Sequence, residues 1–123
     1  DYRLHRIGAP NNVDNVADDG DGTHRYRTQS LRNITLTGPY MHAGVFDTLP
    51  QVLAFYRRRG APPPGAPPPP NVGPLDPLFL NVRVPPQDDA DIIAFLRGLQ
   101  DDTYDTEAPV DVPSGLPVGG SIQ

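Results

Sequence analysis

The sequence contains no cysteine, no lysine and no tryptophan, and Met41 is its only methionine. Without cysteine the chain can form neither a disulfide framework nor a thiolate metal site. No apolar run is long enough to span a membrane, and no signal peptide is recognisable. The chain opens at Asp1 rather than at methionine, so we expect a processed product, a fragment or one part of a longer protein.

Positive charge is also scarce. The ten basic residues are all arginine and stand against 15 acidic residues, which gives a net charge of −5. The only basic cluster is the run from Arg57 to Arg59, which a solvated helix end explains. Because there is no stripe of positive charge, nucleic acid is not an expected partner.

Proline, in contrast, is abundant, with 17 prolines and 12 glycines in 123 residues. The prolines cluster in residues 61–77, a Pro-rich loop that can form neither a helix nor an interior strand. Residues 101–123 are acidic and then rich in proline and glycine, and they are predicted to form an extended tail. We therefore expect two compact regions separated by a polyproline-like surface segment.

Residues 1–47 are predicted to be loops. The acidic run from Asp18 to Asp21 lacks the alternating ligand spacing of an EF-hand calcium loop, so it is interpreted as a turn. Residues 29–47 contain apolar side chains without a clean period, interrupted by glycine and proline. This pattern predicts turns with one short helical turn.

A first helix is predicted over residues 48–59. Asp47 or Thr48 can cap its start. Pro50 fits its first turn, and Gly60 suits the position after its end. Its apolar residues recur at helical spacing and are expected to form one buried face: Leu49, Val52, Leu53 and Tyr56.

A second helix is predicted over residues 86–100, with Asp88 and Asp89 placed favourably at the positive end of its dipole. One apolar face is expected to hold Ile92, Ile93, Phe95, Leu96 and Leu99. Two helices and long loops bury too little apolar surface to fold well alone. The chain is therefore expected to need a partner, a cofactor or both.

Several short motifs follow one another along the chain: Tyr26–Asn33, Leu36–Gly44, Thr48–Leu49, Leu75–Leu78, Ile92–Leu99 and Val112–Pro117. Their order and spacing resemble bacterial di-haem cytochrome c peroxidases and MauG-like proteins, from about Tyr2 to Gly120. Gln29 replaces the usual proline of the first motif, and Ala43 replaces a commoner acidic residue in the second. Residues 1–8 are similar to the stretch just after the second Cys-x-x-Cys-His haem motif of that family.

The resemblance implies a mostly α, loop-rich fold: a fragment of a cytochrome c-like haem domain, completed by another chain or by a missing N-terminal half. It also implies that haem c is attached covalently outside this chain, which has no cysteine. In this interpretation the chain is divided into haem-packing loops (1–47), a ligand helix (48–60), a Pro-rich loop (61–77), a closing helix region (78–100) and the tail (101–123).

Tyr56 is the residue that the resemblance assigns as distal ligand of the haem iron, counting from Thr48 and Leu49. A tyrosinate is a hard anionic donor that suits ferric iron. The alternative is a core aromatic residue with a hydrogen-bonded hydroxyl. Met41 is a second candidate ligand, although its place in the motif fits packing better than coordination.

His42 and Arg32 are candidate haem-binding residues of a different kind. His42 is expected either to hydrogen-bond near the haem or to be a structural histidine satisfied by backbone carbonyls. Arg32 is expected to pair with a haem propionate or to form an ordinary salt bridge. His5 and His24 lack metal-ligand spacing, so solvent or backbone contacts are expected for both.

Calcium is the other cofactor that the resemblance implies. The backbone carbonyls of Thr37 and Pro39 would be its ligands in this chain, since calcium accepts neutral oxygen donors. A side-chain ligand would come from the missing half.

The function implied is part of a periplasmic di-haem peroxidase or MauG-like oxidase, with this chain capping the C-terminal haem that relays electrons. Peroxide would react at the other haem, so no catalytic residue is expected here and the isolated chain should be inactive. Expected partners are a polypeptide carrying the Cys-x-x-Cys-His motifs and a redox-protein donor or protein substrate. The alternatives are an electron-transfer haem subunit without peroxidase activity and a haem-free interaction module.

Overall fold

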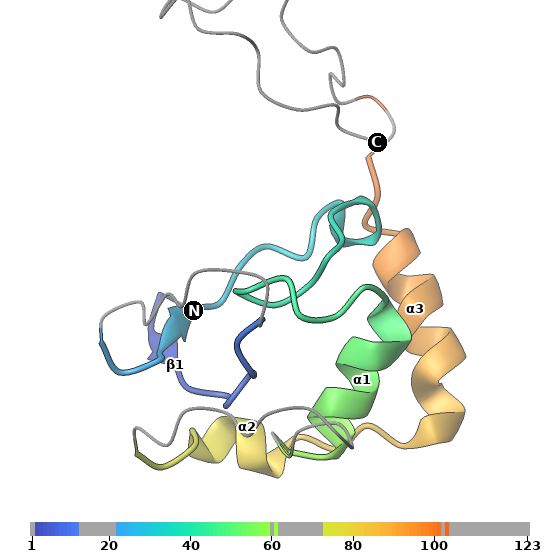
Figure 1. The fold of residues 1–123 in the computed structure, drawn as a ribbon. Helices are drawn as coiled ribbons and strands as arrows, with labels where there is room; N and C mark the ends of the chain where they lie inside the picture. The colour runs from blue at the N-terminus through green and yellow to red at the C-terminus, as the bar shows by residue number, and fades with distance from the viewer. Residues whose placement is uncertain (1, 13–21, 60, 62–72, 102, 104–123) are drawn as a thin grey trace, which may run out of the picture.

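A computed structural model describes residues 2–12, 22–59, 61, 73–101 and 103 of the chain. The described part is small, helical and loop-rich, as predicted (Figure 1). Its regular elements, in chain order, are β1 (Leu4–His5), β2 (Tyr26–Arg27), η1 (Ile34–Leu36), α1 (Leu49–Arg57), α2 (Pro77–Asn81), η2 (Pro86–Asp88) and α3 (Asp89–Arg97).

Helix α1 begins as the sequence predicts. Thr48 is its N-cap, and the Gln51 Oε1 accepts hydrogen bonds from the backbone N–H groups of Asp47 and Thr48, at 2.8 and 3.0 Å. Its end differs from the prediction, because Arg59 rather than glycine takes the left-handed conformation that follows the helix, with φ 54°. Gly60 lies outside the described residues.

Three phenylalanine rings form the centre of the core. Phe55 of α1 is fully buried and lies 5.5 Å from Phe46 and 5.7 Å from Phe79, measured between ring centroids. Leu49 and Leu53 are also buried. The predicted buried face of α1 was therefore incomplete: it omitted Phe55, because the loop before α1 and helix α2 cover a second side of the helix.

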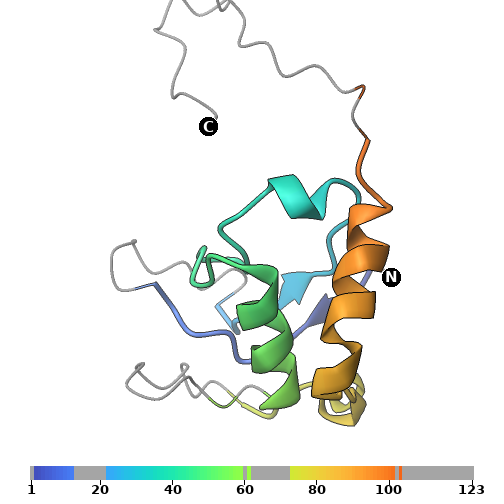
Figure 2. The same ribbon diagram turned by 90° about the vertical axis from the view of Figure 1, so that its right-hand side faces the viewer.

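Helix α3 lies beside α1 (Figure 2). The predicted second helix starts at Pro86 as expected, but it is divided into the 3₁₀ turn η2 and α3 and ends at Arg97, three residues early. Leu96 is buried, but Phe95 is 63% exposed, so its placement on the buried face was wrong. Within the described residues, α3 contacts α1, η1 and η2, and Phe95 lies outside these contacts.

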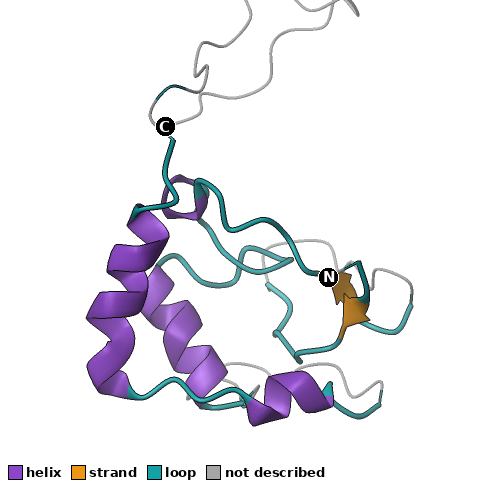
Figure 3. Cartoon of the chain, turned by 180° about the vertical axis from the view of Figure 1, so that it is seen from behind, coloured by secondary structure: helices purple, strands orange, loops and turns teal. Residues whose placement is uncertain are grey.

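The N-terminal segment contains a short strand pair that the sequence pattern did not predict. β1 and β2 pair antiparallel, with Leu4 opposite Arg27 and His5 opposite Tyr26 (Figure 3). The buried Arg6 side chain donates to the carbonyl of Gly73, and its own carbonyl accepts from the N–H of Asp76 at 2.9 Å. These bonds fix the N-terminal segment to the chain that leads into α2.

Helix α2 lies at the boundary between the predicted Pro-rich loop and the predicted closing region. Its N-cap Asp76 accepts from the N–H of Leu78 at 2.8 Å, and Pro77 occupies the first turn. Residues 62–72 of the predicted loop, the tail beyond 103 and the acidic run from Asp18 to Asp21 lie outside the described residues. Within the described ranges, no helix has the length and apolar character needed to cross a membrane.

The aromatic core gives a matched test. Phe55→Ala should lower the free energy of unfolding by about 3–5 kcal/mol, because it removes a fully buried ring and leaves a cavity. Phe95→Ala, on the exposed side of α3, should change it by less than about 0.5 kcal/mol. Urea denaturation followed by circular dichroism measures both, and equal losses would contradict this assignment of the core.

Candidate functional site

Tyr56 lies at the edge of the aromatic core, near the end of α1. Its ring meets Phe79 edge to face at 5.4 Å and Phe55 at 5.9 Å. Among the described residues its hydroxyl has no hydrogen-bond partner, and burial raises the pKa of this phenol. Both the assignment of Tyr56 as a ligand and the alternative of a core tyrosine stay predictions.

Met41 packs against the same core, and it is half-buried. Its backbone is left-handed, with φ 69°. It lies in a turn closed by two backbone hydrogen bonds between Tyr40 and Phe46, at 2.7 and 3.4 Å. The structure therefore places Met41 and Tyr56 around one aromatic cluster, where Met41 acts as a packing residue.

The three histidines gather around Tyr26. The Tyr26 hydroxyl lies 3.4 Å from the Nδ1 of His24, and the Tyr26 ring stacks on His42 at 3.9 Å with an interplanar angle of 22°. His5 lies directly opposite Tyr26 in the strand pair. The expectation of solvent or backbone contacts for His5 and His24 was wrong, because both make side-chain hydrogen bonds.

Sequence reasoning missed Tyr26 as a site residue. One signal was present, since His24 and Tyr26 are two residues apart and an extended chain places such residues on one face. The contributions of His5 and His42 depend on pairing between distant segments, which no local pattern encodes. His42 itself is exposed, and its ring stacks on an aromatic ring.

Arg32, Thr37 and Pro39 lie on the exposed loop around η1. The hydroxyl and the N–H of Thr103 lower the pKa of Asp101, and the charge of Arg32 adds a smaller effect in the same direction. The carbonyl oxygens of Thr37 and Pro39 accept no hydrogen bond from the described part of the chain.

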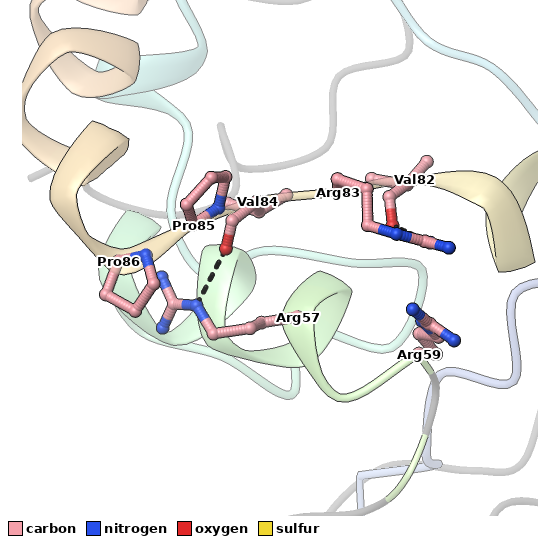
Figure 4. A pocket seen from close by; sticks show the side chains of 7 residues that line it. All are labelled: Arg57, Arg59, Val82, Arg83, Val84, Pro85 and Pro86. Carbon is pink, nitrogen blue, oxygen red and sulfur yellow. Dashed lines mark hydrogen bonds between the residues drawn. The ribbon is translucent and has the colours of Figure 1, made fainter.

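A separate groove lies between the end of α1 and the segment before η2 (Figure 4). None of the predicted site residues lines it; its lining is Arg57, Arg59, Val82, Arg83, Val84, Pro85 and Pro86. Over the described ranges, no group of three or more histidine, aspartate or glutamate side chains could hold a metal ion.

Comparisons with known proteins agree on one relationship. A cytochrome-c peroxidase of Pseudomonas sp. (strain SCT), IdrP2, is 33% identical over 94 residues, which are 76% of this chain and 22% of that protein. The methylamine utilization protein MauG of Paracoccus denitrificans (strain Pd 1222) is 38% identical over 58 residues, 47% of this chain and 14% of MauG. The chain is a partial homologue of cytochrome c peroxidases and MauG.

A solved structure extends this homology to the fold. The crystal structure of a MauG-like protein associated with microbial copper homeostasis matches with a TM-score of 0.63 and 28% identity, over 84% of this chain and 36% of that one. No family model matches the chain. The chain spans about a fifth of the length of the curated relatives it matches. The family resemblance predicted from the motifs is confirmed.

The contact between His5 and Asp76 predicts a pH-dependent contribution to stability. The hydrogen bond from His5, at 2.8 Å, and then the N–H of Leu78 lower the pKa of Asp76. A carboxyl whose pKa is lower in the folded state than in the unfolded state stabilises the fold at pH values above its unfolded pKa, about 3.9. That stabilisation is lost as the pH falls through the pKa of the folded state.

Asp76→Asn keeps a good N-cap and removes the charge. The unmodified chain should be more stable than this variant at neutral pH, and the difference should shrink below about pH 4. Urea midpoints across this pH range measure the effect. In a chain that already carries His5→Ala, Asp76→Asn should lower the stability much less. If the losses from the two substitutions simply add, the pairing is contradicted.

Proposed function

We propose that this chain caps the C-terminal haem of a periplasmic di-haem peroxidase or MauG-like oxidase. The homology to cytochrome c peroxidases and to MauG supports the class of protein. The role of the chain within that class rests on Tyr56. Its ring packs against the aromatic core, and its hydroxyl has no hydrogen-bond partner in the described chain. Since the chain has no cysteine, its haem c is attached elsewhere.

The surroundings of Tyr56 fit an iron ligand. Burial raises the pKa of the phenol, so the hydroxyl stays protonated unless a positive charge lies next to it. A ferric haem would supply that charge and would carry electrons to the second haem, where peroxide reacts. Phe79 and Met41 would exclude water from the ligand side.

The remaining site residues have supporting roles in this proposal. His42 would lie near the haem or the path between the haems, and Arg32 would pair with a propionate. Acid and base groups for peroxide cleavage would stand beside the other haem, so the chain itself contributes positioning and electron transfer. Its partners would be the polypeptide carrying the Cys-x-x-Cys-His motifs and a redox protein or protein substrate.

Tyr56→Phe tests the ligand assignment. In the haem-loaded protein, this substitution should abolish the electron paramagnetic resonance and absorption signature of a His/Tyr haem, because phenylalanine offers no donor atom. Tyr40→Phe is the matched control and should leave the signature unchanged. A His/Met spectrum in the unsubstituted protein would contradict the role of Tyr56, and absence of haem from the purified complex would exclude the proposed function.

Calcium is the second proposed cofactor, with Thr37 and Pro39 as its carbonyl ligands. Both oxygens accept no hydrogen bond from the described chain, which fits a cation that binds neutral oxygen donors. Dialysis against a chelator should remove about one calcium ion per protein, the number that one such site would hold. Elemental analysis before and after re-addition measures it, and a protein that never binds calcium would contradict this site.

A further inference from the structure

All three histidines of the chain lie around one tyrosine, Tyr26. Such a grouping suggests a metal site, but the described residues hold no set of three potential ligands in suitable positions. Instead, His24 hydrogen-bonds the Tyr26 hydroxyl, His42 stacks on the Tyr26 ring, and the backbone of His5 pairs with that of Tyr26. The tyrosine, rather than a metal, is the centre of this cluster.

The contact with His24 gives the phenol a proton acceptor. With Nδ1 unprotonated, His24 accepts from the Tyr26 hydroxyl at 3.4 Å. His24 is only 8% exposed, and its backbone is left-handed, with φ 52°. Strained backbone of this kind in a buried polar residue is concentrated at functional positions.

The other two histidines lie next to Tyr26. The exposed His42 ring stacks on the Tyr26 ring at 3.9 Å, so Tyr26 connects the buried His24 to the protein surface. His5 is paired with Tyr26 in the strand ladder, and its Nδ1 lies 2.8 Å from the Asp76 carboxylate. The ring stack and the backbone pairing hold Tyr26 beside His24.

We propose that Tyr26 is a redox-active tyrosine that relays electrons, with His24 as the acceptor of its phenolic proton. Oxidation removes one electron from Tyr26, which passes to an iron centre oxidised by peroxide, and the proton moves to Nδ1 of His24. The products are a neutral tyrosyl radical and an imidazolium. An electron from the donor or protein substrate then reduces the radical, and the proton returns to the phenolate oxygen.

This inference rests on the proposed function for its oxidant, but the Tyr26–His24 pair stands on its own geometry. Neutral tyrosine loses an electron easily only when its proton has an acceptor at hand. Tyr40 and Tyr56 have no imidazole partner among the described residues, and Tyr2 is 99% exposed. Tyr26 is thus the described tyrosine suited to this reaction.

The test uses the full haem-loaded protein and a flash-generated oxidant, tris(bipyridine)ruthenium(III), with a cobalt(III) pentaammine as electron acceptor. The unsubstituted protein should give a tyrosyl radical by electron paramagnetic resonance. Tyr26→Phe should remove most of this signal, whereas Tyr40→Phe should not. His24→Asn, which tolerates the left-handed backbone, should slow radical formation roughly 100-fold, the lower end of what a positioned proton acceptor contributes.

Two further measurements separate the possible outcomes. In heavy water the unsubstituted protein should form the radical more slowly, which tests proton movement without any substitution. Peroxide in place of the flash should give the same signal; a radical from the flash but none from peroxide would support the Tyr26–His24 pair and count against the peroxidase function. A flash signal that survives Tyr26→Phe, or forms at the unsubstituted rate in His24→Asn, would overturn the proposal.

Discussion

The stack of Phe46, Phe55 and Phe79 is the contact on which the rest of the described structure depends. Each ring comes from a different segment, so burying them together brings the loop before α1, α1 itself and α2 to one place. Helix α2 then carries Asp76, which fixes the N-terminal segment. Hydrogen bonds alone contribute little net stability, so these polar ties depend on the apolar contact that positions α2.

Helices α1 and α3 could be predicted from sequence because their signals are local: a cap, a proline in the first turn and an apolar period. The errors arose where burial depends on distant segments. Phe55 is buried because the loop before α1 and helix α2 both pack on α1, whereas Phe95 lies on a side of α3 that no other described element covers. In the cluster around Tyr26 only the spacing of His24 and Tyr26 is local, since strand register and the turn between Tyr40 and Phe46 bring in His5 and His42.

Two tyrosines of the candidate site lie in opposite environments. Tyr56 has aromatic neighbours and no hydrogen-bond partner in the described chain, which disfavours its anion until a cation approaches. Tyr26 has imidazoles around it and a nitrogen ready to take its proton. In the two proposals the same side chain would coordinate a metal in one place and exchange an electron and a proton in the other, because its neighbours differ.

Arg57 follows Tyr56 in α1, and its guanidinium is held by Asp89 at 2.5 Å and by the carbonyl of Val84 at 2.9 Å. These two bonds join the end of α1, where Tyr56 lies, to the start of α3 some thirty positions later in the chain. Successive helix residues are turned by about 100°, so any rotation of this helix end that moved Tyr56 would also have to break the contacts of Arg57.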